Sequence, residues 1–586
     1  MSPIETRALG RQSDNAARCA TMVALPPTSP KLFVVITGAI HNDSRAVHVA
    51  QARNRSRMKR RWSCLTVFVI AIFLYGAAVL VADAYIGVFF ETNDDVASMM
   101  YAHGFGLGYE PSPLLLFSNI WLGRLILWIG APFDRWSYGL VLLGAQVLSM
   151  ATIATSLRRL NGMTGLTLLL VGMAGLRGLM APQFTIVAGF CAIAAVCLLL
   201  AYARRPQGLL PPTAAVFVLF GSLIRAEMVA MVLLVAIPFL LQWSLLRSGR
   251  AWVAGLVAAS LYYLAAFDHF SALASPEWED FRDLNLLRAA ITDFGMGSEL
   301  IANAQARSAG GLSLNDALLL SSWWFLDPGM TKPEALRAAI ATAGAHRSFL
   351  LNADRLGALW SDFLAPSMLA ISALAIALAA VTRQVRARWL AALGIFLLLA
   401  LLITAAGRTT ISRVYFPLLV LLACVPLAVV PDRRSTGRVA AWVGLAAGIA
   451  TVFGVGAMAN TKARNAASAT VSLASLDSDR LYLVWAANLP FEGLYRPLER
   501  REDMPQQRFF GIGTHQRSPL ALAHFGGDID NLLAAYRSAS GLSFITWPGA
   551  RDLLATYCSE RLDSRQVVIE ELSLPGIFVG TYSCPR

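Results

Sequence analysis

Charged side chains are scarce in this 586-residue sequence, at 15% of all residues, whereas a soluble globular chain carries about 25%. Apolar residues make up 56%, and the mean hydropathy is +0.57. This composition excludes an ordinary soluble enzyme, and it excludes a disordered scaffold because such chains are poor in apolar residues. Cysteine is also scarce, with seven residues, which excludes a disulfide-rich secreted domain.

Several enzyme motifs are missing too. The sequence has no internal repeat, Walker loop, dinucleotide fingerprint or GxSxG motif, and no CxxC pair or His/Cys cluster with metal-ligand spacing. Cys558 and Cys584 lie alone in the C-terminal tail, where a disulfide and two free thiols both remain open. Four other cysteines lie in apolar segments and behave as small apolar residues: Cys64, Cys191, Cys197 and Cys424.

The formal net charge of +13 follows the apolar part of the chain. Residues 1–57 carry +5, the apolar body (58–267 and 363–459) carries +13, residues 268–362 carry −5 and residues 460–586 carry 0. The basic excess is therefore typical of the Lys/Arg bias of cytoplasmic loops. We expect no nucleic-acid partner.

Apolar runs recur at about 20 residues, the length that crosses a bilayer core of about 30 Å. We predict eleven membrane helices, at 62–82, 136–157, 163–181, 184–203, 209–224, 228–246, 251–267, 363–382, 389–406, 414–430 and 439–458. The basic clusters then fall on one side of the membrane, as the positive-inside rule requires of the cytoplasmic face. We expect a multi-pass protein of a bacterial-type inner (plasma) membrane, with a cytoplasmic N-terminus and a periplasmic or extracellular C-terminal domain.

The predicted fold class is a membrane all-α bundle with a small external α/β or α+β domain. Residues 1–57 are a disordered cytoplasmic tail, or the true start is Met58. Residues 58–459 form the transmembrane domain, and residues 460–586 form the external domain. That domain alternates strand-like runs (480–485, 541–547, 566–571 and 577–582) with helix-like runs (528–538 and 549–561).

Two external loops, 83–135 and 268–362, interrupt the transmembrane domain. In the second loop, Leu312 to Phe325 is expected to lie flat on the membrane. The expected interface anchors are Trp278, Trp323, Trp324 and Phe325, since aromatic residues are enriched at headgroup level.

Two adjacent carboxylates, Asp94 and Asp95, open the first external loop. Beside a membrane such a pair is costly unless it is solvated, paired or metal-bound. In a helix or turn the two side chains diverge, so that one points into a cavity while the other braces the loop or holds a cation. The ordinary alternative is a solvated juxtamembrane pair or a helix cap. Glycines from Gly104 to Gly108 predict a tight turn shortly afterwards.

Four arginines break the charge rule on the outer side: Arg177, Arg225, Arg408 and Arg413. Arg177 lies inside a predicted helix and should face the bundle with a partner, and Arg225 has Glu227 nearby. Arg408 and Arg413 flank hydroxyl residues with no acid between them, which suits a phosphate or pyrophosphate at headgroup depth. The alternative is that both snorkel to lipid headgroups.

An acidic first external loop containing Asn93-Asp94-Asp95, an interfacial helix, about eleven membrane helices and an external C-terminal domain together resemble the GT-C superfamily of membrane glycosyltransferases. The resemblance implies transfer of a hexose or pentose from a polyprenyl-phosphate carrier to an acceptor hydroxyl of a glycan, lipid or protein at the outer face. It implies that Asp94 is the general base and that Asp95 orients the site or binds a cation. The substrate-binding candidates are Arg408, Arg413, Arg177, Arg225 and His103.

Under this resemblance the carrier is already activated, so no nucleotide donor is required. No second acidic motif is clear in the later external loop, and a divalent cation (Mg²⁺ or Mn²⁺) stays open as the one cofactor. The alternative from another class is a transporter or flippase of lipid-linked saccharides, which predicts midplane ionisable residues and paired interrupted helices. A non-catalytic assembly or sensor protein would tolerate the loss of Asp94.

Overall fold

The computed structural model describes residues 65–133, 136–161, 172, 175–345, 353–381, 385–409, 411–429, 437–499 and 503–585. The expectations for residues 1–57 and for a start at Met58 lie outside these residues, as does most of the helix predicted at 163–181. Val67–Arg586 forms one compact unit.

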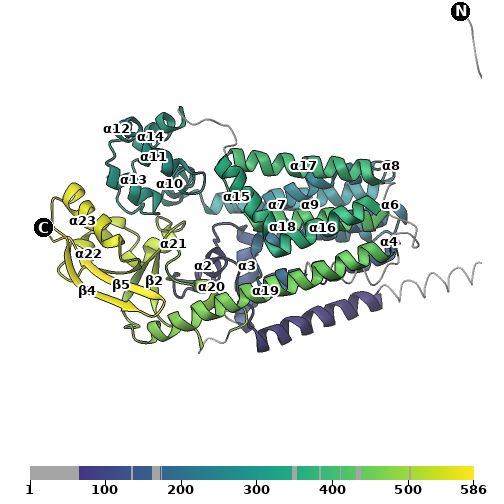
Figure 1. Ribbon diagram of the computed structural model, residues 1–586, viewed down its shortest axis with the longest axis horizontal. Coiled ribbons are helices and arrows are strands. Elements are labelled where there is room, and N and C mark those ends of the chain that lie inside the picture. Colours follow the sequence, from purple (N-terminus) through teal and green to yellow (C-terminus); the bar gives the residue numbers. More distant parts are fainter. Residues whose placement is uncertain are drawn as a thin grey trace, which may run out of the picture. The chain divides into compact units, whose positions relative to one another are not determined.

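Seven described helices are long and apolar enough to cross a membrane, which confirms a polytopic, mainly helical protein (Figure 1). They are the first helix (Leu65–Tyr85), α4 (Trp136–Asn161), α6 (Phe184–Arg204), α7 (Leu210–Leu240), α9 (Gly249–Ala272), α17 (Arg386–Ala405) and α19 (Gly437–Ala474). An eighth is added if α15 (Ala353–Leu364) and α16 (Pro366–Val381), which are bent by 79°, form one span. Two shorter apolar helices are α3 (Ile120–Phe133) and α18 (Ser412–Val429).

Helix α7 reverses direction at Arg225, which has non-helical φ and ψ of −158° and 95°. The position that a Cβ atom would take on Gly221 is 3.0 Å from Val229 Cγ2, whereas residues eight apart in a straight helix are separated by about 12 Å. Gly208, before α7, also lies beside Arg250, after it, with 3.3 Å between the corresponding Cβ position and the guanidinium. The two arms of α7 are therefore antiparallel, and they match the spans predicted at 209–224 and 228–246.

The last membrane helix is longer than predicted. Helix α19 continues to Ala474, past the expected end at residue 458 and the domain boundary at 459. Residues 460–474 contain no Gly or Pro and are rich in Ala, so nothing in them stops the helix. The extension contacts the C-terminal domain: the Cβ position of Gly493, in α20 (Phe491–Leu494), is 2.9 Å from Ala466 Cβ.

The C-terminal domain contains both strands and helices, as predicted. Its five-stranded sheet has the order β2-β1-β3-β5-β4, with β1, β2 and β3 parallel and β5 antiparallel to β3 and β4. The strands are β1 (Leu481–Trp485), β2 (Arg508–Ile512), β3 (Leu542–Thr546), β4 (Val567–Leu574) and β5 (Ile577–Ser583). Strand β2 was not predicted, because its short run shows no apolar–polar alternation. Helices α22 (Ile529–Arg537) and α23 (Ala550–Arg561) match the predicted helical runs.

The two faces of this sheet belong to different apolar cores. Tyr482 and Val484 join the core of the helix bundle. Leu483 and Trp485 point to the other face and join a second core with residues of the second external loop. The helices of that loop are α10 (Pro276–Thr292), α11 (Met296–Ala302), α12 (Ala304–Ala309), α13 (Leu314–Ser321) and α14 (Pro333–Ala345).

Trp324 and Phe325 lie inside the second core, at 0% and 1% exposure. The rings of Trp324 and Trp485 have centroids 4.8 Å apart. The expectation that these two residues anchor the loop in the membrane interface is therefore wrong, and so is a flat placement of Leu312 to Phe325. An apolar helix face has the same sequence pattern whether lipid or a sheet covers it.

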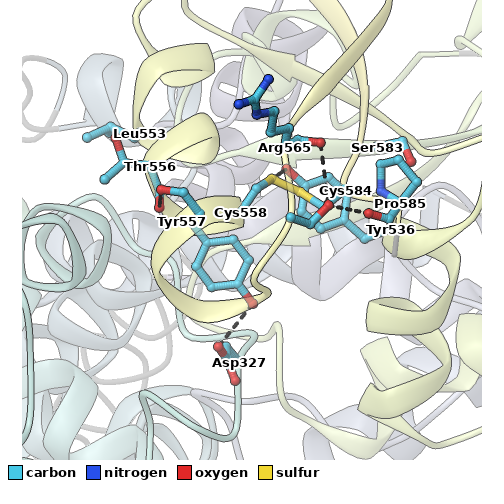
Figure 2. The surroundings of a disulfide bond; sticks show 12 residues. Asp327, Tyr536, Leu553, Thr556, Tyr557, Cys558, Arg565, Ser583, Cys584 and Pro585 are labelled. Carbon is cyan, nitrogen blue, oxygen red and sulfur yellow. Dashed lines mark hydrogen bonds between the residues drawn. A yellow bond between two sulfur atoms is a disulfide. The ribbon is translucent and has the colours of Figure 1, made fainter.

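Cys558 in α23 and Cys584 after β5 form a disulfide, which decides between the two alternatives left open (Figure 2). The Cys584 amide donates to the Tyr536 carbonyl at 3.0 Å. In the same region the Tyr557 hydroxyl donates to Asp327 of the second external loop at 3.0 Å. The disulfide thus ties the C-terminal strand to the helix that contacts this loop.

Candidate active site

The two acids of the first loop lie in the first turn of α2 (Asn93–His103). Extended backbone at Thr92 precedes the helix, and Gly104 ends it with a φ of 65°. The partial positive charge of a helix N-terminus favours carboxylates in this turn. The tight turn predicted at the glycines follows directly, since Gly106 also has a positive φ, 61°.

Asp95 is completely buried and fully hydrogen-bonded. One carboxylate oxygen accepts from the Thr92 hydroxyl at 2.8 Å. The other accepts from the Phe184 amide, at the start of α6, at 3.0 Å and from the Tyr138 hydroxyl of α4 at 3.2 Å. Burial raises the pKa of Asp95 to about 8. Asp95 therefore braces α2 against α4 and α6.

Asp94 is the accessible member of the pair, with 28% of its side chain exposed. Its carboxylate lies 4.0 Å from the Arg413 guanidinium at the start of α18. Burial raises the pKa of Asp94 and the nearby Asp293 raises it further, whereas the charges of Arg413, Arg225 and Arg288 lower it. Asp94 is thus a partly exposed carboxylate with one guanidinium at 4.0 Å and two more within electrostatic range.

Two further arginines predicted from the sequence belong to the same cluster. Arg225 lies at the reversal of α7 and forms an ion pair with Glu227 at 3.1 Å. The charges of Arg408, Arg413 and Asp94 also act on it. The Arg408 guanidinium lies 5.6 Å from the centre of the Phe294 ring. The structure therefore brings Asp94 together with Arg225, Arg408 and Arg413, from three distant parts of the chain.

Arg288, in α10, is a member of the cluster that sequence reasoning missed. It is 5% exposed, and its charge acts on Asp94. Asp293 lies 3.4 Å from its guanidinium, and the Trp323 ring centre lies 5.0 Å away. Trp323 has a φ of 74°, which is rare for a bulky residue and marks a strained, held conformation. An arginine within an acidic loop gives no sequence signal that it faces a distant carboxylate.

Arg177 is occupied by protein partners. It is 7% exposed and forms an ion pair with Glu91 at 2.9 Å. It also donates to the hydroxyls of Ser367 at 2.9 Å and Ser412 at 3.3 Å. Arg177 therefore has the partner expected from its position. It connects Glu91, three residues before Asp94, to Ser412, the residue before Arg413.

His103 lies apart from this cluster. It is the last residue of α2, nine residues from Asp94 and so about 13 Å along the helix axis. Its Nε2 is 2.8 Å from the Ser137 hydroxyl of α4. His103 thus forms a contact between helices, and its substrate-binding role stays a prediction.

The C-terminal domain contributes one buried histidine to this region. His515 is 8% exposed, its ring centre is 4.7 Å from that of Tyr101 in α2, and its Nε2 has no hydrogen-bond partner among the described residues. Burial, together with the charge of Arg288, lowers the pKa of His515 to about 3. His515 is therefore neutral at physiological pH.

The charged side chains around Asp94 are mainly basic, and the divalent cation left open by the sequence stays a prediction. Both oxygens of Asp95 are already taken by hydrogen-bond donors. The charged neighbours of Asp94 are mainly arginines, whereas hard cations need several oxygen ligands. In the described part of the chain, no three His, Cys, Asp or Glu side chains gather closely enough to hold a metal ion.

Neither a protein-family model nor a curated protein matches this sequence. The fold is similar to two solved structures of ArnT from Cupriavidus metallidurans. The apo-state structure has 14% sequence identity and a TM-score of 0.39, over 89% of this chain and 100% of that chain. The structure bound to undecaprenyl phosphate has 13% identity and a TM-score of 0.36, over 88% of this chain and 99% of that chain.

Proposed function

We propose that this protein is a GT-C-type membrane glycosyltransferase that moves a sugar from a polyprenyl-phosphate carrier to an acceptor hydroxyl. The observation that supports it is the surrounding of Asp94: one partly exposed carboxylate lies 4.0 Å from Arg413 and within the electrostatic reach of Arg225 and Arg288. A carboxylate takes a proton, and guanidinium groups hold a phosphate, so this arrangement contains both groups that the transfer requires.

The arginines hold the phosphate of the carrier. Among the described residues, the one carboxylate within 4.0 Å of Arg413 is Asp94, and Arg408 has none. Planar guanidinium groups bind phosphate oxygens in pairs. As the bond between the sugar C1 and the phosphate oxygen breaks, negative charge develops on the phosphate, and the arginines stabilise it.

Asp94 accepts the proton of the acceptor hydroxyl while the acceptor oxygen forms its bond to C1, and the configuration at C1 inverts. Its raised pKa makes it a stronger base than an exposed aspartate. Asp95 keeps α2 in place and does not touch the reacting atoms. Arg288 of the second loop acts electrostatically on both Asp94 and His515 of the C-terminal domain.

The test is transfer of a radiolabelled sugar from a polyprenyl-phosphate donor to a membrane-lipid extract, by the full chain in nanodiscs. Asp94→Asn should lower transfer by about 10²- to 10⁴-fold, the usual contribution of general-base catalysis. Asp530→Asn is the matched control, because Asp530 also lies in the first turn of a helix, α22, but is exposed and distant.

Full transfer by Asp94→Asn would contradict the base assignment. Movement of the labelled lipid across vesicles without any transfer would instead support the flippase alternative.

A further inference from the structure

A cavity of about 510 Å³ lies between α9 and the first arm of α7, along Gly208 to Leu219. It is lined almost entirely by apolar and small residues of the first arm of α7 and of α9. Gly208, Ala215, Ala254 and Ala258 keep the two helices from filling it. The two helices run side by side here, because Gly208 lies next to Arg250 at one end and Leu219 and Leu261 line the other.

The cavity is a groove that is open at the surface of the helix bundle. Three of its lining residues, Val216, Val253 and Val257, are 64%, 62% and 52% exposed. From Gly249 to Leu261, α9 rises about 18 Å at 1.5 Å per residue. This length is close to half of the roughly 30 Å bilayer core, so one acyl chain of a single leaflet matches it in length.

One end of the groove is basic. Arg250 lines it directly, and α9 begins there, at Gly249. The first amides of a helix have no carbonyl partner within the helix, so a helix start favours anions. Arg204, Arg205 and Arg247 lie in the neighbouring chain segments, and residues 242–267 contain no acid.

We propose that this groove binds an anionic phospholipid of the leaflet on that side. One acyl chain lies along α7 and α9, and the phosphodiester lies at Arg250 and the start of α9. Basic pockets between membrane helices bind anionic headgroups in this manner. The proposal does not depend on the glycosyltransfer reaction.

The polyprenyl carrier fits this groove less well. Its phosphate would lie at Arg408 and Arg413, near Arg225, where the two arms of α7 meet. A tail that entered from there would place its apolar end against Arg250, and a charge next to hydrocarbon is costly. A phospholipid places a phosphate there instead.

Native mass spectrometry of the purified full chain, incubated with equal amounts of phosphatidylglycerol and phosphatidylcholine of the same acyl chains, tests the proposal. The wild type should retain phosphatidylglycerol over phosphatidylcholine by about fivefold, the effect of one basic residue near a headgroup. Arg250→Gln should abolish this preference, and Ala254→Phe, which fills the groove, should lower retention of both lipids.

Arg388→Gln is the matched control, because Arg388 is an exposed arginine near the start of α17 and outside the groove. Size-exclusion chromatography checks that each variant is folded. The proposal is overturned if Arg250→Gln keeps the same preference as Arg388→Gln. It is also overturned if polyprenyl phosphate displaces the retained phosphatidylglycerol, which would assign the groove to the carrier.

Discussion

Arg177 and Glu91 form a buried ion pair at 2.9 Å, with 8% and 13% of their side chains exposed. Glu91 lies three residues before Asp94, and the same guanidinium contacts Ser412, the residue before Arg413. One arginine therefore connects the two segments that carry the proposed base and one of the proposed phosphate ligands.

Arg177→Met should lower the free energy of unfolding by about 3 kcal/mol, because removing one partner leaves a buried charge without compensation. The double variant with Glu91→Gln should recover part of the loss. Arg124→Met is the control, because the Arg124–Asp268 pair is exposed and should contribute less than about 1 kcal/mol. Thermal unfolding in detergent measures all four proteins. Equal losses for Arg177→Met and Arg124→Met would contradict a buried role for this pair.

Arg413→Gln and Arg408→Gln should each weaken binding of polyprenyl phosphate by about 10- to 100-fold, the effect of losing a charge-assisted hydrogen bond. Isothermal titration calorimetry with the full chain measures the affinity. Arg388→Gln should bind as the wild type does, because Arg388 lies at the opposite end of α17 from Arg408. Unaltered affinity in both site variants would remove the phosphate role and favour snorkelling to headgroups.

The transfer rate should rise with pH as Asp94 ionises, and the rise should lie above the ordinary range of an aspartate, because burial raises its pKa. The charge of Arg413 lowers that pKa, so Arg413→Gln should move the rising limb to higher pH. His515 should add no limb above pH 5, because its pKa is about 3. The pH profile of kcat/KM checks these shifts. A limb that stays in place in Arg413→Gln would contradict the coupling of Asp94 to Arg413.

Asp95 should make the protein less stable as pH rises from about 4 to about 8. Its folded-state pKa, about 8, exceeds the ordinary value of 3.8, so the folded state binds the proton more tightly and loses this advantage as the proton leaves. Asp95→Asn should flatten this part of the stability profile, as measured by melting temperature against pH. Asp530→Asn should follow the wild-type slope. A steeper loss of stability with rising pH in Asp95→Asn would contradict this explanation.

The disulfide between Cys558 and Cys584 closes a loop with a sequence separation of 26. Its reduction, or Cys558→Ser, should destabilise the C-terminal domain by about 3 kcal/mol. Alkylation of the denatured protein with and without reductant shows whether the bond is present, and near-ultraviolet circular dichroism follows the melting. Reductant should have no further effect on a Cys558→Ser/Cys584→Ser variant. Identical melting of the wild type with and without reductant would contradict a stabilising bond.

Local features of the molecule were predictable from the sequence. The arms of α7, most other membrane helices, the four predicted strands and the turn at Gly104 follow from apolar length, residue period and glycine, which act within a few residues. The sequence also predicted that one acid of the pair would be accessible while the other braced the loop, because adjacent side chains on a helix diverge. The sequence therefore determined a polytopic helical protein with an acidic first loop and unusually placed arginines.

Only the tertiary structure decided which of these residues meet. Arg288 and His515 approach the region of Asp94 through the second loop and the C-terminal domain, and no spacing in the chain encodes that approach. Trp324 became a core residue and His103 a contact between helices, because what covers a helix face depends on distant segments. Electrostatic interactions act across space, so only the fold showed that Asp95 is held by Thr92, Tyr138 and Phe184 while Asp94 lies near Arg413.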